Sequence, residues 1–227
     1  MTYFDGFARE LLTFFNQLKK NNTREWFDSH REDYETFVKQ PAAEFVLSMG
    51  ERLKEIAPGI NVIPRVNQSL FRLNRDTRFS RDKSPYKTNL GIWFWEGERK
   101  RMECSGFYFH CEDEMLMLGV GMYMFPKDLL DQYRDAVVED RIGARLRKTT
   151  EMISKKGYVI SGKHYKKVPR GYDPSHRNAD LLLHNGLAAM FETKIPKEFY
   201  TGAIIDYVYS YFKDMAPLHT WLRDSLK

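Results

Sequence analysis

Residues 65–87 read Arg-Val-Asn-Gln-Ser-Leu-Phe-Arg-Leu-Asn-Arg-Asp-Thr-Arg-Phe-Ser-Arg-Asp-Lys-Ser-Pro-Tyr-Lys. Seven cations and two anions give this stretch a net charge of +5, which equals the formal net charge of the whole 227-residue chain. Arginine keeps its proton at any working pH, so cations this close repel one another unless carboxylates or a bound anion neutralise them. We call residues 65–87 the arginine segment and expect it to bind an anion.

The arginine segment is predicted to join two strands of a sheet. Ser69–Arg75 is interpreted as a strand with its apolar side chains on one face. Residues 76–85 then form a loop, because serines and a proline interrupt them. Phe79 and Tyr86 are expected to anchor this loop to the core. Such a loop lies at a sheet edge or end, where functional side chains are common.

The side chains of the arginine segment divide into three candidate roles. The candidate anion ligands are its cations Arg72, Arg75, Arg78, Lys83 and Lys87. An aspartate beside arginines can hold a guanidinium in one orientation, which is the role expected of Asp76 and Asp82. Tyr86 is placed to donate a proton or to stack. Asp76, Asp82 and Tyr86 are the candidates for catalysis. The sequence identifies no reaction and does not decide whether the protein is an enzyme.

A second basic stretch covers Lys163–Arg177, with five cations against the single Asp173 and with histidines and tyrosines interleaved. Cations mixed with aromatic side chains suit phosphate contacts combined with stacking. Two interpretations stay open. The stretch is either a loop that closes over the arginine segment, with Arg170 as a further anion ligand, or an exposed basic loop that only raises solubility.

The central pattern Arg72-x-x-Arg75-Asp76-x-Arg78-Phe79, followed by Asp82-Lys83-x-x-Tyr86, resembles the motif of an uncharacterised bacterial family of conserved domains of unknown function. The resemblance spans nearly the entire chain. It also includes the flanking stretches Phe4-Asp5-Gly6-Phe7, Asn21-Asn22 before Trp26-Phe27, and Lys167-x-Pro169-Arg170-Gly171-Tyr172. It implies an intracellular mixed α+β domain with its functional centre at the motif, and it carries no established activity.

The chain as a whole is predicted to be one α+β domain with a mainly antiparallel sheet covered by helices. Its hydrophobic content of 42% and aromatic content of 15% exclude a disordered protein. Residues 1–58 form a helical part, residues 60–124 the sheet with the arginine segment, and residues 125–227 further helices with short strands.

Apolar periodicity and capping signals place the individual elements. Helices are predicted over residues 6–20, 22–38, 41–56, 126–156 (one long helix or two shorter ones), 175–184 and 196–216. Strands are predicted over residues 60–65, 69–75, 89–95, 106–111, 115–123, 158–161 and 187–195. Asn22 is expected to cap the second helix and Pro217 to break the last one.

Several standard sites are missing from the sequence. Gly119-Val-Gly121 lacks the third glycine of a dinucleotide fingerprint, and no metal-ligand spacing, Walker loop or nucleophile elbow occurs. We therefore expect no cofactor, no metal and no membrane partner. Cys104 and Cys111 are interpreted as free thiols, which places the protein in the cytoplasm. His30 is interpreted as a packing histidine beside Trp26.

Three functional hypotheses follow, in decreasing order of preference. The first is binding, with or without turnover, of a small phosphate- or carboxylate-bearing ligand by the arginine segment. The second is a structural role, in which the charged side chains of the segment form an internal ion-pair network. The third is nucleic-acid binding by both basic stretches, placed last because surface charge alone does not require the interspersed aspartates.

Overall fold

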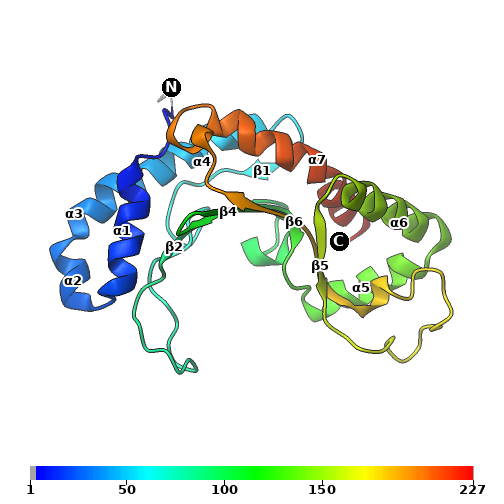
Figure 1. Cartoon of the computed structure of the whole chain (residues 1–227). Coiled ribbons are helices and arrows are strands. Elements are labelled where there is room, and N and C mark those ends of the chain that lie inside the picture. Colours follow the sequence, from blue (N-terminus) through cyan, green and yellow to red (C-terminus); the bar gives the residue numbers. More distant parts are fainter. Residues whose placement is uncertain (1–3, 227) are drawn as a thin grey trace. The chain divides into compact units, whose positions relative to one another are not determined.

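The protein has an α+β fold, shown here as a computed structural model that describes residues 4–226 (Figure 1). Six strands form an antiparallel sheet in the order β1-β2-β3-β4-β6-β5, which confirms the predicted fold class. Within the described residues, no helix has both the length and the apolar character needed to cross a membrane.

The elements alternate between helical and strand-rich stretches along the chain. The helices are α1 (Arg9–Lys20), α2 (Arg24–Ser29), α3 (Arg31–Tyr34), α4 (Gln40–Leu53), α5 (Lys127–Val138), α6 (Asp140–Lys155) and α7 (Ile204–Ser225). The strands are β1 (Ile60–Asn61), β2 (Asn89–Glu96), β3 (Gly106–Glu112), β4 (Met115–Met122), β5 (Val159–Lys163) and β6 (His184–Lys194). A π-helical turn, Glu35–Lys39, joins α3 to α4. The 126–156 stretch is two helices, as one of the two predicted alternatives had it.

The chain divides into two compact units. Unit 1 comprises Met1–Phe94, Tyr108–Leu118 and Glu192–Ser210. Unit 2 comprises Trp95–Phe107, Gly119–Phe191 and Tyr211–Lys227. Organisation as one domain stays a prediction.

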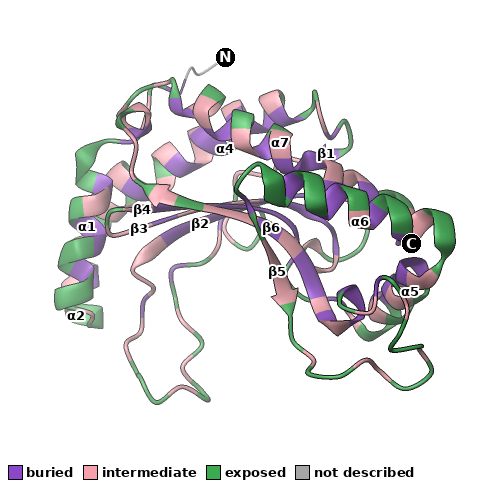
Figure 2. Ribbon diagram, turned by 45° about the vertical axis from the view of Figure 1, so that its right-hand side comes forward, coloured by how far each residue is buried: buried purple, intermediate pink, exposed green. Residues whose placement is uncertain are grey.

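Unit 1 is built on an aromatic core. Phe7 stacks on Phe199 with ring centroids 4.8 Å apart, and Phe45 packs against Phe109 of β3 at 4.7 Å. All four rings are buried, and aromatic pairs at this spacing stabilise more than their buried area alone. Figure 2 shows the buried residues concentrated in the strands and on the inner faces of the helices.

Unit 2 buries a polar network beside its aromatic core. Tyr133 packs edge-on against Trp221 with ring centroids 6.1 Å apart. The fully buried His219 is hydrogen-bonded through Nδ1 to Ser105 Oγ at 3.0 Å and through Nε2 to Glu96 Oε2 at 2.8 Å. These bonds satisfy both ring nitrogens, as a buried imidazole requires.

Two expectations about elements after residue 170 are wrong. The predicted 175–184 helix is only a 3₁₀ turn at Leu181–Leu183, preceded by turns in which Asp173 accepts hydrogen bonds from Ser175. Pro217 lies inside α7 and does not break it, because the helix continues to Ser225.

The predicted strand at Ser69–Arg75 is also wrong. The chain turns at Asn67, whose φ is +65°, and Leu70 N–H bonds back to Arg65 O at 3.1 Å. Only isolated bridges remain in the described residues of this stretch, between Val66 and Leu70, between Leu70 and Ile92, and between Asn74 and Tyr86. A left-handed residue just before the stretch prevents a regular ladder, although the segment still lies beside β2.

Asn22 does not cap α2 as predicted. Thr23 is the N-cap, and its hydroxyl accepts a hydrogen bond from Trp26 N–H at 3.2 Å. The Asn22 amide instead donates to Tyr86 O at 3.0 Å and accepts from Tyr86 N–H at 3.1 Å. The Asn22 side chain, just before α2, therefore holds the C-terminal end of the arginine segment through the backbone of Tyr86.

Replacing Asn22→Ala is expected to lower the free energy of unfolding by about 1–3 kcal/mol, since each lost hydrogen bond contributes roughly 0.5–1.5 kcal/mol. Asn21→Ala is the matched control, because its exposed side chain bonds only to Gln17 O within the same helix end. Urea unfolding of both variants measures the difference. Equal losses would show that the bridge to Tyr86 does not stabilise the fold.

Candidate functional site

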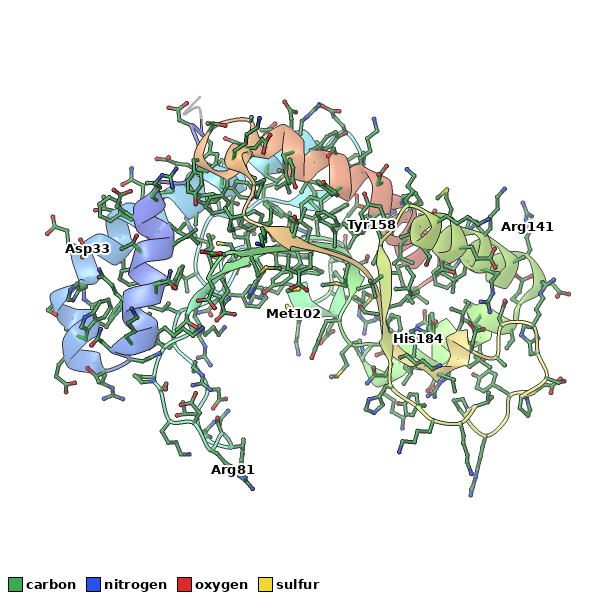
Figure 3. The ribbon with its side chains drawn as sticks, viewed as in Figure 1. Asp33, Arg81, Met102, Arg141, Tyr158 and His184 are labelled. Atoms are coloured by element: carbon green, nitrogen blue, oxygen red, sulfur yellow. The ribbon has the colours of Figure 1, made fainter. Side chains whose placement is uncertain are left out.

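The arginine segment forms an irregular hairpin arm that extends away from the start of β2 (Figure 1). Its two sides are joined by Lys87 N–H donating to Leu73 O at 2.8 Å and by Arg75 N–H donating to Pro85 O at 2.9 Å. Beyond these bonds the chain makes an exposed tip, and Arg81 lies at its end (Figure 3).

Two ion pairs lie within the tip, and the second of them joins its two sides. Arg78 binds Asp76 with both arms of its guanidinium, through Nε at 3.0 Å and Nη2 at 2.7 Å. Arg75 pairs with Asp82 and also donates to Ser84 O at 3.3 Å. Both aspartates therefore orient guanidinium groups, which is the geometry predicted for them.

Each aspartate also closes a turn of the backbone. Asp76 accepts from Arg78 N–H at 3.2 Å, and Asp82 accepts from Ser84 N–H at 2.9 Å. Hydrogen bonds from the Arg78 side chain lower the pKa of Asp76 to about 2, and hydrogen bonds from Ser84, then Arg75, lower that of Asp82 to about 2. Such carboxylates are weak general bases at neutral pH, and a catalytic role for them stays a prediction.

The two ion pairs do not neutralise all the positive charge of the arm. No carboxylate among residues 4–226 makes an ion pair with Arg65, Arg72 or Arg81. Lys83 donates only to the backbone oxygen of Thr77, at 2.8 Å. The two aspartates thus neutralise two cations, and an exposed surplus remains on the arm.

The two aromatic residues of the motif have opposite environments. Tyr86 is buried, with its ring 4.5 Å from that of Phe27, and anchors the arm as expected. Phe79 was expected to do the same but is 96% exposed. Arg78 Cζ lies 5.8 Å from the centroid of its ring. The ion pairs, and not Phe79, hold the tip together.

A polar cluster that the sequence reasoning missed lies at the root of the arm. His110 Nδ1 is 3.1 Å from Tyr108 Oη and 3.3 Å from Asn89 Nδ2, and its Nε2 is 3.7 Å from Glu112 Oε2. Thr88 donates to Glu112 at 2.7 Å. Burial lowers the pKa of His110 and raises that of Tyr108 to about 12. Tyr108, His110 and Glu112 alternate along β3. This period of two in the sequence was the available signal that their side chains lie on one face of the strand.

Lys87 belongs to this root cluster and not to the tip. Its Nζ lies 5.3 Å from the centroid of the Phe71 ring, and Phe71 packs edge-on against Tyr108 at 5.8 Å. Both rings stand over Gly91, where a Cβ would lie 3.1 Å from Tyr108 Oη and 3.2 Å from Phe71. A side chain at this position would therefore require Phe71 or Tyr108 to move by a few tenths of an ångström.

Two further candidates belong to other stretches of the chain. Arg170 is exposed on the basic stretch of unit 2, and its role as a ligand of the arm stays a prediction. His30 stacks on Trp26 at 4.0 Å and is hydrogen-bonded to Trp26 O at 2.8 Å, which confirms the packing interpretation. Residues 4–226 contain no group of three or more His, Cys, Asp or Glu side chains arranged to hold a metal ion.

The ion pairs at the tip predict a pH dependence. Because the folded pKa of both aspartates lies below the unfolded value, their contribution to stability is present above about pH 4 and is lost as the pH falls through about 2. Carboxyl ¹³C NMR should give midpoints near 2 for both. Arg78→Gln should raise the midpoint of Asp76 and leave that of Asp82 in place. Movement of both midpoints, or of neither, would contradict the pairing.

Comparison with known proteins is consistent with the resemblance noted in the motif. The model of the family described as conserved hypothetical protein (DUF2461) matches residues 10–221. No curated protein matches the chain. The match covers nearly the whole sequence, so the chain belongs to the DUF2461 family.

Proposed function

We propose that this member of the DUF2461 family binds single-stranded nucleic acid through the tip of the arginine segment. The observation that carries the proposal is an exposed arm on which Phe79, 96% exposed, is flanked by arginines that exceed the available carboxylates. The side chains available for contact are Arg72, Phe79, Arg81 and Lys83.

The geometry favours a polyanion over a small anion. A small phosphate or carboxylate needs donors that converge on one point. Here Arg75 and Arg78 already bind carboxylates, and the remaining cations are distributed along an exposed arm. Charges spread in this way suit a chain of phosphates, each of which contacts one cation. The order of hypotheses from the sequence is therefore reversed.

A structural role explains only part of the arm. The pairs Arg75–Asp82 and Arg78–Asp76 brace the tip, which accounts for the aspartates that argued against nucleic-acid binding in the sequence. An arm that served the fold alone would not require surplus arginines or an exposed aromatic ring. The bracing presents these side chains in a fixed arrangement, which lowers the entropy lost on binding.

A single strand suits the exposed ring better than a duplex. Unpaired bases present their faces for stacking on aromatic side chains, and this stacking tolerates any sequence. In a duplex those faces are covered by neighbouring base pairs.

We place this function in the cytoplasm, because Cys104 and Cys111 are free thiols, as expected in a reducing compartment.

Charge removal on the arm should weaken binding and flatten its salt dependence. For a single strand, the slope of log K against log salt is about −0.7 per neutralised phosphate, so Arg72→Ala with Arg81→Ala should reduce it by roughly 1.4. Fluorescence anisotropy with a labelled oligonucleotide at several salt concentrations measures this. Lys20→Ala with Lys197→Ala removes the same charge from exposed positions of unit 1 and should change the slope little. Equal effects of the two double variants would contradict a site on the arm.

Removing the aromatic ring should weaken binding in a different way. Phe79→Ala is expected to cost roughly 1–3 kcal/mol of binding free energy, or about 5–150-fold in Kd, at an unchanged salt slope. Phe79→Tyr keeps a ring of the same shape and should retain the affinity. If Phe79→Ala binds as tightly as the wild type, or if a small phosphate competes fully with the oligonucleotide, stacking of a single strand is the wrong interpretation.

A further inference from the structure

Arg134 of α5, in unit 2, is a buried cation with incomplete bonding. Its side chain is only 13% exposed. Its Nε–H is completely buried and has no hydrogen-bond partner in the part of the chain that the structure describes. Arginine carries five donors and no acceptor, so each unpaired donor needs an acceptor from elsewhere.

The neighbouring carboxylates do not supply that acceptor. Asp131 Oδ1 lies 3.7 Å from Arg134 Nη1, which is too long for a hydrogen bond, and the Asp131 side chain is 60% exposed. Asp135, the next residue on the helix, accepts a hydrogen bond from the Tyr172 hydroxyl at 2.8 Å. The guanidinium therefore has weak charge compensation at its edge.

An aromatic residue of the second basic stretch packs against this guanidinium. The Tyr165 ring lies 5.2 Å from Arg134 Cζ, a cation–π contact that covers one face of the group. Tyr172, which binds Asp135, comes from the same stretch. The two tyrosines thus attach the stretch Lys163–Arg177, which has five cations and one aspartate, to the adjacent residues Arg134 and Asp135 of α5.

We propose that Arg134, together with this basic stretch, forms a binding site for a phosphate group. The planar fork of a guanidinium matches two oxygens of a phosphate, and the Tyr165 ring contacts a face of the group, so the two Nη nitrogens are the donors left for a ligand. A phosphate suits the site better than a carboxylate, because four of the five cations of the stretch make no ion pair among residues 4–226, and only Arg177 is paired, with Asp140. The cations of the same stretch that are exposed for such contacts are Lys163, Lys166, Lys167 and Arg170.

This site does not depend on the arm of unit 1. The phosphate is either a free phosphate or phosphate monoester, or one group of a nucleic-acid backbone. These sources share the chemistry that Arg134 recognises, and the experiment distinguishes them. A site for free phosphate responds to inorganic phosphate alone, whereas a backbone site responds to an oligonucleotide in phosphate-free buffer.

The test measures thermal unfolding and calorimetric binding with inorganic phosphate and with an oligonucleotide, at constant ionic strength set with chloride. The wild type should show saturable stabilisation by at least one of the two. Arg134→Met keeps the length of the buried stem and should weaken that binding at least tenfold. Arg134→Lys keeps the charge but lacks the planar fork of donors, and its affinity should lie between those of the wild type and Arg134→Met. The exposed Arg141 of α6, labelled in Figure 3, gives the matched control Arg141→Met, which should bind as the wild type does.

Stability without ligand separates binding from a structural role. In chloride buffer Arg134→Met should be at least as stable as the wild type, because it removes a buried charge with incomplete bonding. A large loss of stability in this variant would show that Arg134 serves the fold, and the proposal would then be wrong. The proposal is also overturned if neither probe stabilises the wild type beyond chloride, or if Arg134→Met and Arg141→Met respond alike.

Discussion

The bridge between the Asn22 amide and the backbone of Tyr86 is the constraint on which the arginine segment depends. It joins residues 64 positions apart with a donor and an acceptor on each side. The ring of Tyr86 packs beside Phe27, so backbone and side chain of one residue are both fixed. Tyr86 is also the last buried residue before β2 begins at Asn89. The arm is consequently attached to the helical layer and to the sheet at the same point.

Beyond that attachment the arm is stabilised by its own charges. Asp76 and Asp82 each accept a backbone N–H and an arginine side chain, so each carboxylate both shapes a turn and fixes a cation. Exposed ion pairs of this kind contribute little stability individually. Their effect is therefore conformational: they reduce the number of arrangements that a tip without a hydrophobic core can adopt. The surplus arginines then project from a loop of defined shape.

The sequence predicted what depends on periodicity and missed what depends on distant partners. Leu11, Phe14 and Leu18 recur at helical spacing and are buried in α1, and the apolar run at Asn89–Trp95 is β2 almost to the residue. The failures have long-range causes. Asn22 looked like a helix cap because nothing local shows that Tyr86 will lie beside it. Charge density located the arginine segment, but composition does not reveal whether a phenylalanine among arginines points inward or outward, and Phe79 points outward.

The arginines of the arm and Arg134 of α5 show two states of the same side chain. In the arm, Arg75 and Arg78 meet carboxylates from their own loop, and the segment needs no ligand to hold its shape. In unit 2, Arg134 is more deeply buried than either and yet has an unpaired Nε. Desolvation makes an unpaired donor most costly where burial is greatest. Stability alone would therefore favour full pairing of Arg134 before that of the more exposed Arg75 and Arg78, and the structure shows the opposite. This contrast, and the cations of the neighbouring stretch, are the reasons for proposing that Arg134, and not the paired Arg75 and Arg78, binds a phosphate.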